Sequence, residues 1–289
     1  MTTSPATSAW RPLHPSKSLA LADSRLQLHY AAQFATALGI SFLPRKDDDS
    51  HTNLGWMAAH EALCSREVQG HKGVVQVAVQ PRHLTLLVLR EGTITCQVPL
   101  HGLTVSHVET TLRDTLAESG LDGRRLTLKR HYELPSHNVS HGEPFDVSSS
   151  DEFAELAHWY GNAANLLEEF RSAIAGDEVR CWPHHFDIAT LATIAPGRTS
   201  GAGMLAGDQQ VPEPYYYVNA YPPPGSDRAT APLAGGGYWN TEGWFGAVLT
   251  GSRLSADSNA QAAQVRAFLD SAFEACASLL RGQSGPLRT

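Results

Sequence analysis

Val75-Gln-Val-Ala-Val79, Leu84-Thr-Leu-Leu-Val-Leu89 and Ile94-Thr-Cys-Gln-Val98 decide the fold class of this chain. Their apolar residues alternate or form one short run, which is the pattern of strands with a buried face. The breaks between them, at Pro81-Arg82 and Arg90-Glu91-Gly92, are too short for the long crossover that parallel strands require. The stretch therefore predicts neighbouring antiparallel strands.

Helical periodicity is found on both sides of these strands. Leu26, Tyr30, Phe34 and Leu38 recur every four residues and predict an amphipathic helix over about 20–38. A similar spacing predicts a helix over 105–119. The clearest pattern runs from Phe153 to Ile174 and predicts a helix over 151–175, with Ser150 as its N-cap and Trp159 outside its apolar seam. A last helix is expected over 258–281.

The second half alternates strand patterns with turns. Strands are expected at Leu126–Leu128, Glu178–Trp182, His185–Ile194, Tyr215–Tyr221, Tyr238–Asn240 and Phe245–Thr250. The glycine-rich stretch 197–207 lacks the following helix that a phosphate-binding loop needs, so we expect a mobile loop there. Together, these helix and strand patterns predict an α+β fold of mainly antiparallel sheets with about four helices.

Two arrangements of this fold stay open, namely two similar packed lobes or one continuous domain. In the first, a poorly ordered N-terminus (1–17) precedes an N-terminal lobe (18–130). A polar linker (131–150) then leads to a C-terminal lobe (151–282) that carries the site, followed by a tail (283–289).

Composition narrows the function classes. The chain has 289 residues, 42% of them hydrophobic, and a net charge of −7. An acidic chain without a basic cluster disfavours nucleic acid as a partner. The sequence also lacks the apolar run of about 20 residues that a membrane helix needs. The absence of an apolar signal segment and the scattered, unpaired Cys64, Cys96, Cys181 and Cys276 favour reduced thiols in a cytoplasmic protein. The oligomeric state cannot be read from these features.

The segment Arg180-Cys-Trp-Pro-His-His-Phe-Asp187 is the first of three clusters that could carry chemistry. On a strand, His185 and Asp187 share one face and His184 shares the other with Phe186. His185 and Asp187 could then hold a divalent metal such as Zn²⁺, Fe²⁺ or Mn²⁺, or act in proton transfer. In the alternative interpretation Asp187 only orients His185 by a hydrogen bond.

Strand alternation also groups the second cluster. It places Glu213, Tyr215, Tyr217, Asn219 and Tyr221 on one face. Phenols beside an amide and a carboxylate suit a small polar organic ligand. An aromatic-rich sheet surface packed on a helix would give the same pattern.

The third cluster, 235–245, contains Trp239, Glu242 and Trp244. We expect the three clusters, together with Trp182, to line one concavity, because short Pro- and Gly-rich connections favour adjacent antiparallel strands. Three function classes follow. The first is an enzyme in which Asp187 or Glu242 is the general base and His185 carries a proton or binds a metal. The second is a non-catalytic metabolite-binding module, and the third is a structural or scaffolding protein.

With these segments, the chain resembles an uncharacterised family of bacterial proteins with a domain of unknown function. The resemblance rests on Gln97-Val-Pro-Leu100, Leu167-Glu-Glu-Phe-Arg171, Trp182 to Ala189, Tyr215 to Pro224 and Gly243-Trp-Phe245. More distant members have Trp-Gly-Ser-Phe-Asp-Leu-Ala as the central motif, which matches Phe186, Asp187 and Ala189 but neither histidine. The resemblance implies no activity, and it makes a histidine-dependent metal site special to this branch or absent.

Overall fold

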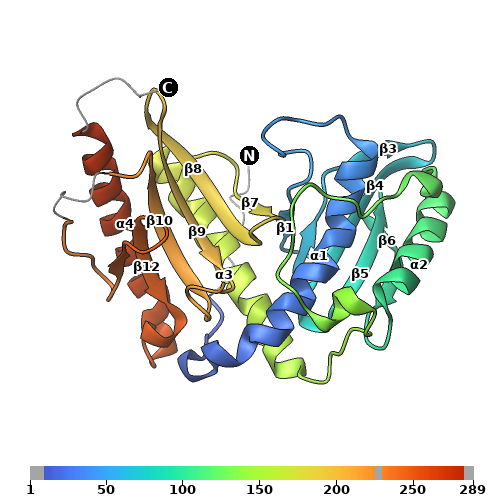
Figure 1. Cartoon of the computed structure of the whole chain (residues 1–289), viewed down its shortest axis with the longest axis horizontal. Helices are drawn as coiled ribbons and strands as arrows, with labels where there is room; N and C mark the ends of the chain where they lie inside the picture. Colours follow the sequence, from blue (N-terminus) through green and yellow to red (C-terminus); the bar gives the residue numbers. More distant parts are fainter. Residues whose placement is uncertain (1–9, 225–229, 283–289) are drawn as a thin grey trace, which may run out of the picture. The chain divides into compact units, whose positions relative to one another are not determined.

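The computed structural model describes residues 10–224 and 230–282, and it shows an α+β fold with two antiparallel sheets (Figure 1). The expected poorly ordered N-terminus lies mostly outside the described residues, and the expected tail lies outside them entirely. The chain divides into two compact units that are interleaved in sequence. The valine-sheet unit is Ala20–Ala157 with Arg180–Asp187; the tyrosine-sheet unit is Met1–Leu19, His158–Val179 and Ile188–Thr289. Whether these units are separate lobes stays a prediction.

The valine-sheet unit contains the strands that the opening stretch predicts. They are β1 (Gly55–Met57), β2 (Ala62–Cys64), β3 (Val68–Gly70), β4 (Gly73–Gln80), β5 (Thr85–Arg90) and β6 (Thr93–Pro99). The order is β1-β2-β4-β5-β6, and β3 pairs with β4. Val77 pairs with Val88, and Val79 with Leu86; all four are fully buried. The expected strand at Leu126–Leu128 is wrong, because this segment forms no strand and instead follows the short 3-10 helix η3 (Gly123–Arg125).

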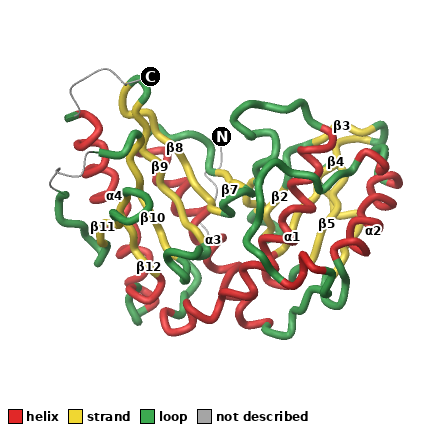
Figure 2. The backbone as a smooth tube through the Cα atoms, viewed as in Figure 1, coloured by secondary structure: helices red, strands yellow, loops and turns green. Residues whose placement is uncertain are grey.

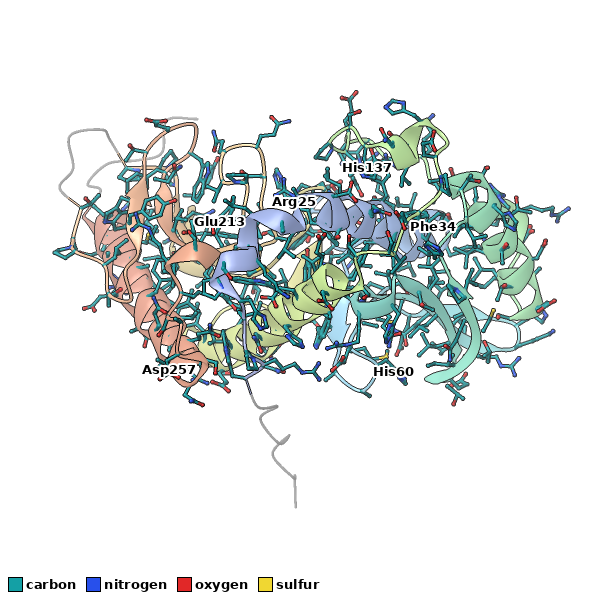
Figure 3. All side chains as sticks on the ribbon, turned by 90° about the horizontal axis from the view of Figure 1, so that it is seen from below. Arg25, Phe34, His60, His137, Glu213 and Asp257 are labelled. Atoms are coloured by element: carbon teal, nitrogen blue, oxygen red, sulfur yellow. The ribbon has the colours of Figure 1, made fainter. Side chains whose placement is uncertain are left out.

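Two helices belong wholly to this unit and lie in front of its sheet in Figure 1. Helix α1 (Ala22–Phe42) follows the 3-10 helix η1 (Pro15–Leu21). Helix α2 (Val105–Glu118) is capped by the Thr104 hydroxyl, which accepts a hydrogen bond from His107 N. The predicted amphipathic character of α1 is wrong. Phe34 (Figure 3) is 1% exposed, but polar residues such as Gln33 and His29 are buried as well.

A strap, residues 131–148, explains why the polar side of α1 is buried. It crosses α1 as a loop (Figure 2), ends before α3, and includes the one-turn 3-10 helix η4 (Asn138–His141). Tyr30 donates a hydrogen bond to Pro135 O at 2.9 Å, and Tyr132 donates one to Gln33 Oε1 at 2.8 Å. The segment expected as a linker is therefore held against a helix by its own polar groups.

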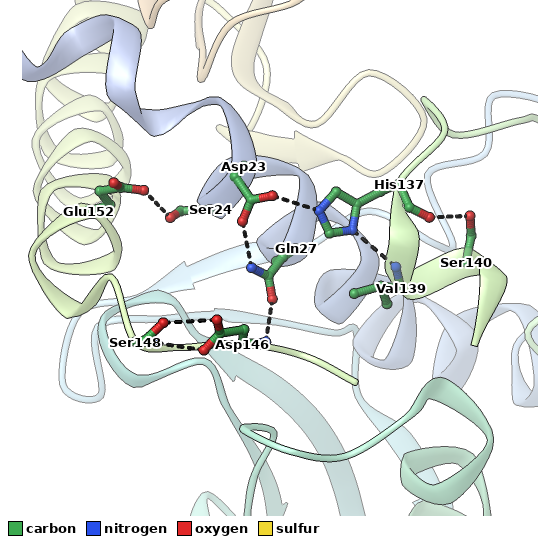
Figure 4. A network of polar contacts seen from close by, with 9 residues as sticks. All are labelled: Asp23, Ser24, Gln27, His137, Val139, Ser140, Asp146, Ser148 and Glu152. Carbon is green, nitrogen blue, oxygen red and sulfur yellow. Dashed lines mark hydrogen bonds and ion pairs between the residues drawn. The ribbon is translucent and has the colours of Figure 1, made fainter. Parts of the chain in front are cut away.

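Figure 4 shows the polar network at the start of α1. The carboxylate of Asp23 accepts from Gln27 Nε2 at 2.7 Å and lies 3.0 Å from His137 Nε2. Gln27 Oε1 in turn accepts from Asp146 N at 2.7 Å. Because His137 Nδ1 accepts from Val139 N, the proton of the neutral ring is on Nε2 and points to Asp23. Side chains of α1 thus replace the backbone partners that an irregular strap lacks.

Helix α3 (Ser150–Ile174) has its first residues in the valine-sheet unit and continues into the tyrosine-sheet unit. The predicted seam is confirmed for Phe153, Leu156, Tyr160, Ala163, Leu167 and Phe170, which are all buried. Two details of the prediction are wrong. The helix already includes Ser150, and Trp159 is buried at 1% exposure.

The tyrosine-sheet unit has its strands in the order β11-β12-β10-β9-β8. They are β8 (Asp187–Ala195), β9 (Arg198–Leu205), β10 (Tyr215–Tyr221), β11 (Tyr238–Asn240) and β12 (Gly246–Thr250); a short 3-10 helix, η5 (Gly251–Arg253), follows β12. Helix α4 (Ser258–Arg281) packs on β9, β10 and β12, and Asp257 caps its N-terminal end (Figure 3). The expected loop at 197–207 is wrong, because β9 occupies most of it.

The four cysteines are free, and no helix of the described residues is long and apolar enough to cross a membrane.

Candidate functional site

The tyrosine strand β10 separates its side chains as the sequence predicts. Tyr216 and Val218 lie on the inner face, where both are fully buried and Cys276 of α4 contacts the Val218 carbonyl at 3.9 Å. Tyr215, Tyr217 and Asn219 alternate with them and lie on the outer face. Tyr217 and Asn219 are only half-buried. The outer face of the sheet therefore carries the residues of the second predicted cluster.

Two members of this cluster hold neighbouring loops. Tyr215 is 3% exposed and donates a hydrogen bond to Asp208 Oδ2 at 2.7 Å. Glu213 accepts from the backbone N and the hydroxyl of Ser252, at 2.6 and 2.7 Å. These two bonds hold the carboxylate against the turn at Ser252. Both residues are therefore structural supports for the outer face.

Tyr217 and Asn219 lie down on the sheet because their partners on β9 are glycines. Tyr217 pairs with Gly203 and Asn219 pairs with Gly201. A β-carbon on Gly203 would lie 2.7 Å from Tyr217 Oη, so the phenol leans across its cross-strand partner. Asn219 Oδ1 accepts a hydrogen bond from Gly201 N at 2.9 Å. An aromatic ring laid over a strand glycine covers backbone that a side chain would otherwise cover.

Trp244 completes this arrangement from the loop before β12. A β-carbon on Gly246 would overlap Trp244 Cζ3, so the indole covers this second glycine. The Trp244 and Tyr217 rings are 6.2 Å apart at 81°, which is edge-to-face geometry, and both are half-buried. We name Tyr217 and Trp244, with Gly203 and Gly246 beneath them, the aromatic corner.

The corner has an apolar base and a charged rim. Val211, Tyr215 and Val248 form its buried base, against which Leu205 and Tyr238 pack. The Arg253 guanidinium lies 4.5 Å from the centre of the Tyr238 ring and donates to Gly236 O at 3.1 Å. Partial desolvation raises the pKa of Tyr238, so this phenol is a neutral donor at pH 7. The rim thus offers a cation and hydroxyl groups beside exposed ring surface.

The other predicted residues of this unit lie apart from the corner. Tyr221 is 67% exposed at the end of β10. Trp239 points to the opposite face from its neighbour Tyr238, stacks on Phe245 at 5.2 Å and donates to Ala231 O. Glu242 is exposed, and its main-chain carbonyl accepts bonds from Trp244 N and Asn240 Nδ2.

The first predicted cluster does not form the expected strand. Pro183–Phe186 is a turn, closed by a bond from Phe186 N to Trp182 O at 2.7 Å, and β8 begins only at Asp187. Phe186 has φ +65°, a left-handed conformation that costs an L-residue about 1–2 kcal/mol. The alternation that grouped His185 with Asp187 on one strand face is therefore wrong. The reason is Pro183, which cannot continue the β7 (Arg180–Trp182) ladder.

This turn is anchored to α1. The Pro183 carbonyl accepts from Gln33 Nε2 at 3.2 Å and lies 2.8 Å from His29 Nε2. The His29 ring stacks on Phe186 with centroids 4.6 Å apart and planes within 3°. Burial lowers the pKa of His29 to about 4, so the ring is neutral and its Nε2–H donates to Pro183. These contacts compensate the strained Phe186.

The two adjacent histidines differ in environment. His184 is half-buried and His185 is exposed, with 4.5 Å between their ring centroids. Partial burial, reinforced by His185, lowers the pKa of His184. The rings of Tyr132 and Trp182 lie 5.9 and 6.3 Å from that of His184.

Asp187 is 9% exposed and close to the fully buried Cys181. Burial, followed by the negative charge of Asp187, raises the pKa of the Cys181 thiol far above its usual range, so this thiol is not a nucleophile at neutral pH. Within the described residues, no group of three or more His, Cys, Asp or Glu side chains could hold a metal ion. A divalent metal held by His185 and Asp187 stays a prediction.

Convergence of the three clusters also stays a prediction, because they are divided between the units. Trp182, His185 and Asp187 belong to the valine-sheet unit, while the β10 row, Trp239, Glu242 and Trp244 belong to the tyrosine-sheet unit. Acid–base catalysis by Asp187, His185 and Glu242 also stays a prediction.

The sequence interpretation missed Arg253 of the rim, Gly201, Gly203 and His29. Gly201 and Gly203 were assigned to a loop, although glycines placed opposite aromatic residues in a strand pattern could have indicated the cover that they receive. His29 was missed because it lies on the polar side of a helix that the strap buries.

In comparisons with known proteins, no family model, no curated protein and no solved structure matches this chain.

Proposed function

We propose that the aromatic corner binds a small molecule that has a flat apolar ring face and a polar edge. The observation that carries the proposal is the half-buried Tyr217 ring, laid over Gly203, with the Trp244 ring edge-on beside it. A planar ring stacked on Tyr217 would meet the Trp244 indole at its side. Rings that are held by their own packing lose little entropy on binding, which favours affinity.

The rim supports a polar edge on this ligand. Next to the corner lie Arg253, which is a cation, and the Tyr238 hydroxyl, which can form hydrogen bonds. Flat heteroaromatic metabolites and pyranose sugars share the required chemistry, because both combine a flat apolar face with polar substituents. We favour a binding role over catalysis, since the carboxylates of Asp208 and Glu213, which hold the loops at the outer face, are engaged in hydrogen bonds.

The experiment is ligand screening by saturation-transfer NMR with two panels, one of bicyclic heteroaromatic compounds and one of pyranose monosaccharides. A hit is then measured by calorimetry. We expect Trp244→Ala and Tyr217→Ala each to lower affinity about tenfold or more, because a tenfold change corresponds to about 1.4 kcal/mol of lost contact. The matched control is Tyr221→Ala, a tyrosine of the same strand face that is 67% exposed, which should leave affinity unchanged.

The two panels distinguish the two ligand sources. If no compound of either panel binds, or if Tyr221→Ala weakens binding as much as Trp244→Ala does, the proposal is wrong and the corner is a packing feature of a structural protein.

Cytoplasmic location and membership of the bacterial family named above are proposals of the same kind. The four free cysteines support the first.

A further inference from the structure

Three polar atoms are buried on the inner face of the tyrosine sheet without a protein partner. They are Ser18 Oγ of η1, Trp159 Nε1 of α3 and Tyr216 Oη of β10. The three residues are 1%, 1% and 0% exposed. A buried donor without a partner costs about 1–3 kcal/mol, and folded proteins satisfy the large majority of such groups with protein atoms or ordered water. Three such buried polar atoms in one unit therefore require an explanation.

Two of the three side chains meet at Gly251, and the third, Tyr216, lies beside the Trp159 ring. A β-carbon on Gly251 would overlap Ser18 Oγ and would lie 3.1 Å from Trp159 Cζ2, the ring carbon next but one to Nε1. Gly251 follows Leu249 by two residues, and Leu249 is the cross-strand partner of Tyr216. Gly251 itself follows the end of this ladder, where its N donates to Pro214 O at 2.7 Å. The Trp159 and Tyr216 rings are 5.7 Å apart.

The chemistry of the three groups is complementary to one small molecule. An indole N–H can only donate, whereas a serine and a tyrosine hydroxyl can each donate or accept. Burial raises the pKa of Tyr216, so its phenol keeps its proton. A partner must therefore accept from Trp159 and exchange bonds with two hydroxyls, which a water molecule does with its two donor and two acceptor sites.

We propose that Ser18, Trp159 and Tyr216 form an internal binding site for one water molecule, beside Gly251 in the core of the tyrosine-sheet unit. The water joins η1, α3 and β10, three segments that are far apart in sequence. Buried waters typically make about three hydrogen bonds to groups that lack other partners, which is the number available here. The chain just before η1 is also joined to a distant segment, but directly: the backbone of Leu13 forms hydrogen bonds of 3.0 and 2.8 Å with the side chain of Gln261 of α4.

The decisive measurement uses the unmodified chain. In a ¹⁵N-resolved NOE/ROE pair of spectra, the Trp159 indole proton should show a cross-peak at the water frequency with the sign of a long-lived contact. A spectrum in which the assigned Trp159 indole proton has no water cross-peak overturns the proposal. This result does not depend on any variant being able to fold.

A double-mutant cycle tests whether the water is shared. Ser18→Ala and Tyr216→Phe should each lower Tm by about 2–4 °C, the shift expected for one lost hydrogen bond of about 1 kcal/mol. The double variant should fall by less than the sum, because either change removes a partner of the same water. The matched control pairs Tyr216→Phe with Thr36→Val, whose buried hydroxyl also lacks a partner but belongs to the valine-sheet unit; these effects should add.

Two results of these Tm measurements would contradict the proposal. If Tyr216→Phe raises Tm, the phenol is dry and its removal relieves a cost. If the shifts of Ser18→Ala and Tyr216→Phe add fully, the two hydroxyls share no water. Either result overturns the proposal.

Discussion

The two sheets use the same antiparallel ladder and fill it differently. In the centre of the valine sheet, two cross-strand pairs of β4 and β5 are alike: Val77 faces Val88 and Val79 faces Leu86, and all four are fully buried. In the tyrosine sheet, partners are unlike: Gly203 faces Tyr217, and the phenol lies across the glycine. Branched partners of similar size stand side by side and close a core, whereas a glycine lets a large neighbour lie down and leave ring surface half-exposed. Pairing of unequal residues is therefore what leaves aromatic ring surface on the outer face of the second sheet, where we propose that a ligand binds.

The largest expected effect tests the valine sheet as a filled core. Leu87 is 1% exposed and belongs to the cluster with Ala78 and Leu89. Leu87→Ala should lower the free energy of unfolding by about 2–5 kcal/mol, because it leaves a cavity. Urea denaturation of the full chain measures this. The matched control is Gln97→Ala, its exposed cross-strand partner, which should change stability by less than about 0.5 kcal/mol. Equal effects would show that this core is not closed.

The next effect concerns the buried histidine on the helix that covers the valine sheet. The pKa of His29 is about 4 in the folded chain and 6.5 unperturbed. Below pH 6.5 the unfolded chain takes up a proton that the folded chain takes up only near pH 4. His29 thus costs no stability above pH 6.5, and about 3 kcal/mol is lost as pH falls from 6.5 to 4.

His29→Gln should remove this slope, because glutamine does not titrate. Unfolding free energies at pH 7, 6, 5 and 4 for both proteins provide the test. A variant that keeps the full slope would place its cause in another group.

A smaller effect tests the unequal pairing in the tyrosine sheet. A β-carbon on Gly203 would lie 2.8 Å from both Ala189 Cβ and the Ile188 carbonyl, besides 2.7 Å from Tyr217 Oη. Gly203→Ala should therefore destabilise the chain by about 1–3 kcal/mol through overpacking, measured by thermal unfolding. Adding Tyr217→Phe removes only one of the three contacts and should restore little. Full recovery in the double variant would mean that the phenol alone requires the glycine.

The smallest effect is expected at the end of the same strand. Tyr221 is 67% exposed, so Tyr221→Ala should change unfolding free energy by less than about 0.5 kcal/mol. Tyr215→Ala, on the same strand face but 3% exposed and bonded to Asp208, should cost several times more. Similar losses of unfolding free energy at both positions would show that the exposed fraction of a tyrosine on this face does not determine its contribution to stability.

The fold class and most elements could be predicted because the relevant signals are local. The alternation of Val75, Val77 and Val79 and the seam of α3 depend only on the side of an element that each residue occupies. The errors arose where a distant segment decides the outcome. The burial of His29 and Gln33 depends on the strap and the Pro183 turn, and no period within α1 reports either.

The site was predictable only in part for the same reason. The alternation along β10 grouped Tyr217 with Asn219, and the structure agrees. That their rings and amides lie flat depends on register with Gly203 and Gly201, which requires knowing that the glycine-rich segment is the neighbouring strand. At His185 the strand pattern failed, because Pro183 converts the segment into a turn that only contacts with α1 stabilise.

The interleaving of the chain has a consequence for its synthesis. The valine-sheet unit needs Pro183 and Phe186 against His29, yet these residues leave the ribosome some 150 positions after helix α1. The nascent unit must therefore wait, with one side of α1 lacking its final cover, while His158–Val179 of the other unit is being translated. A fragment that stops at Ala157 would lack this cover permanently.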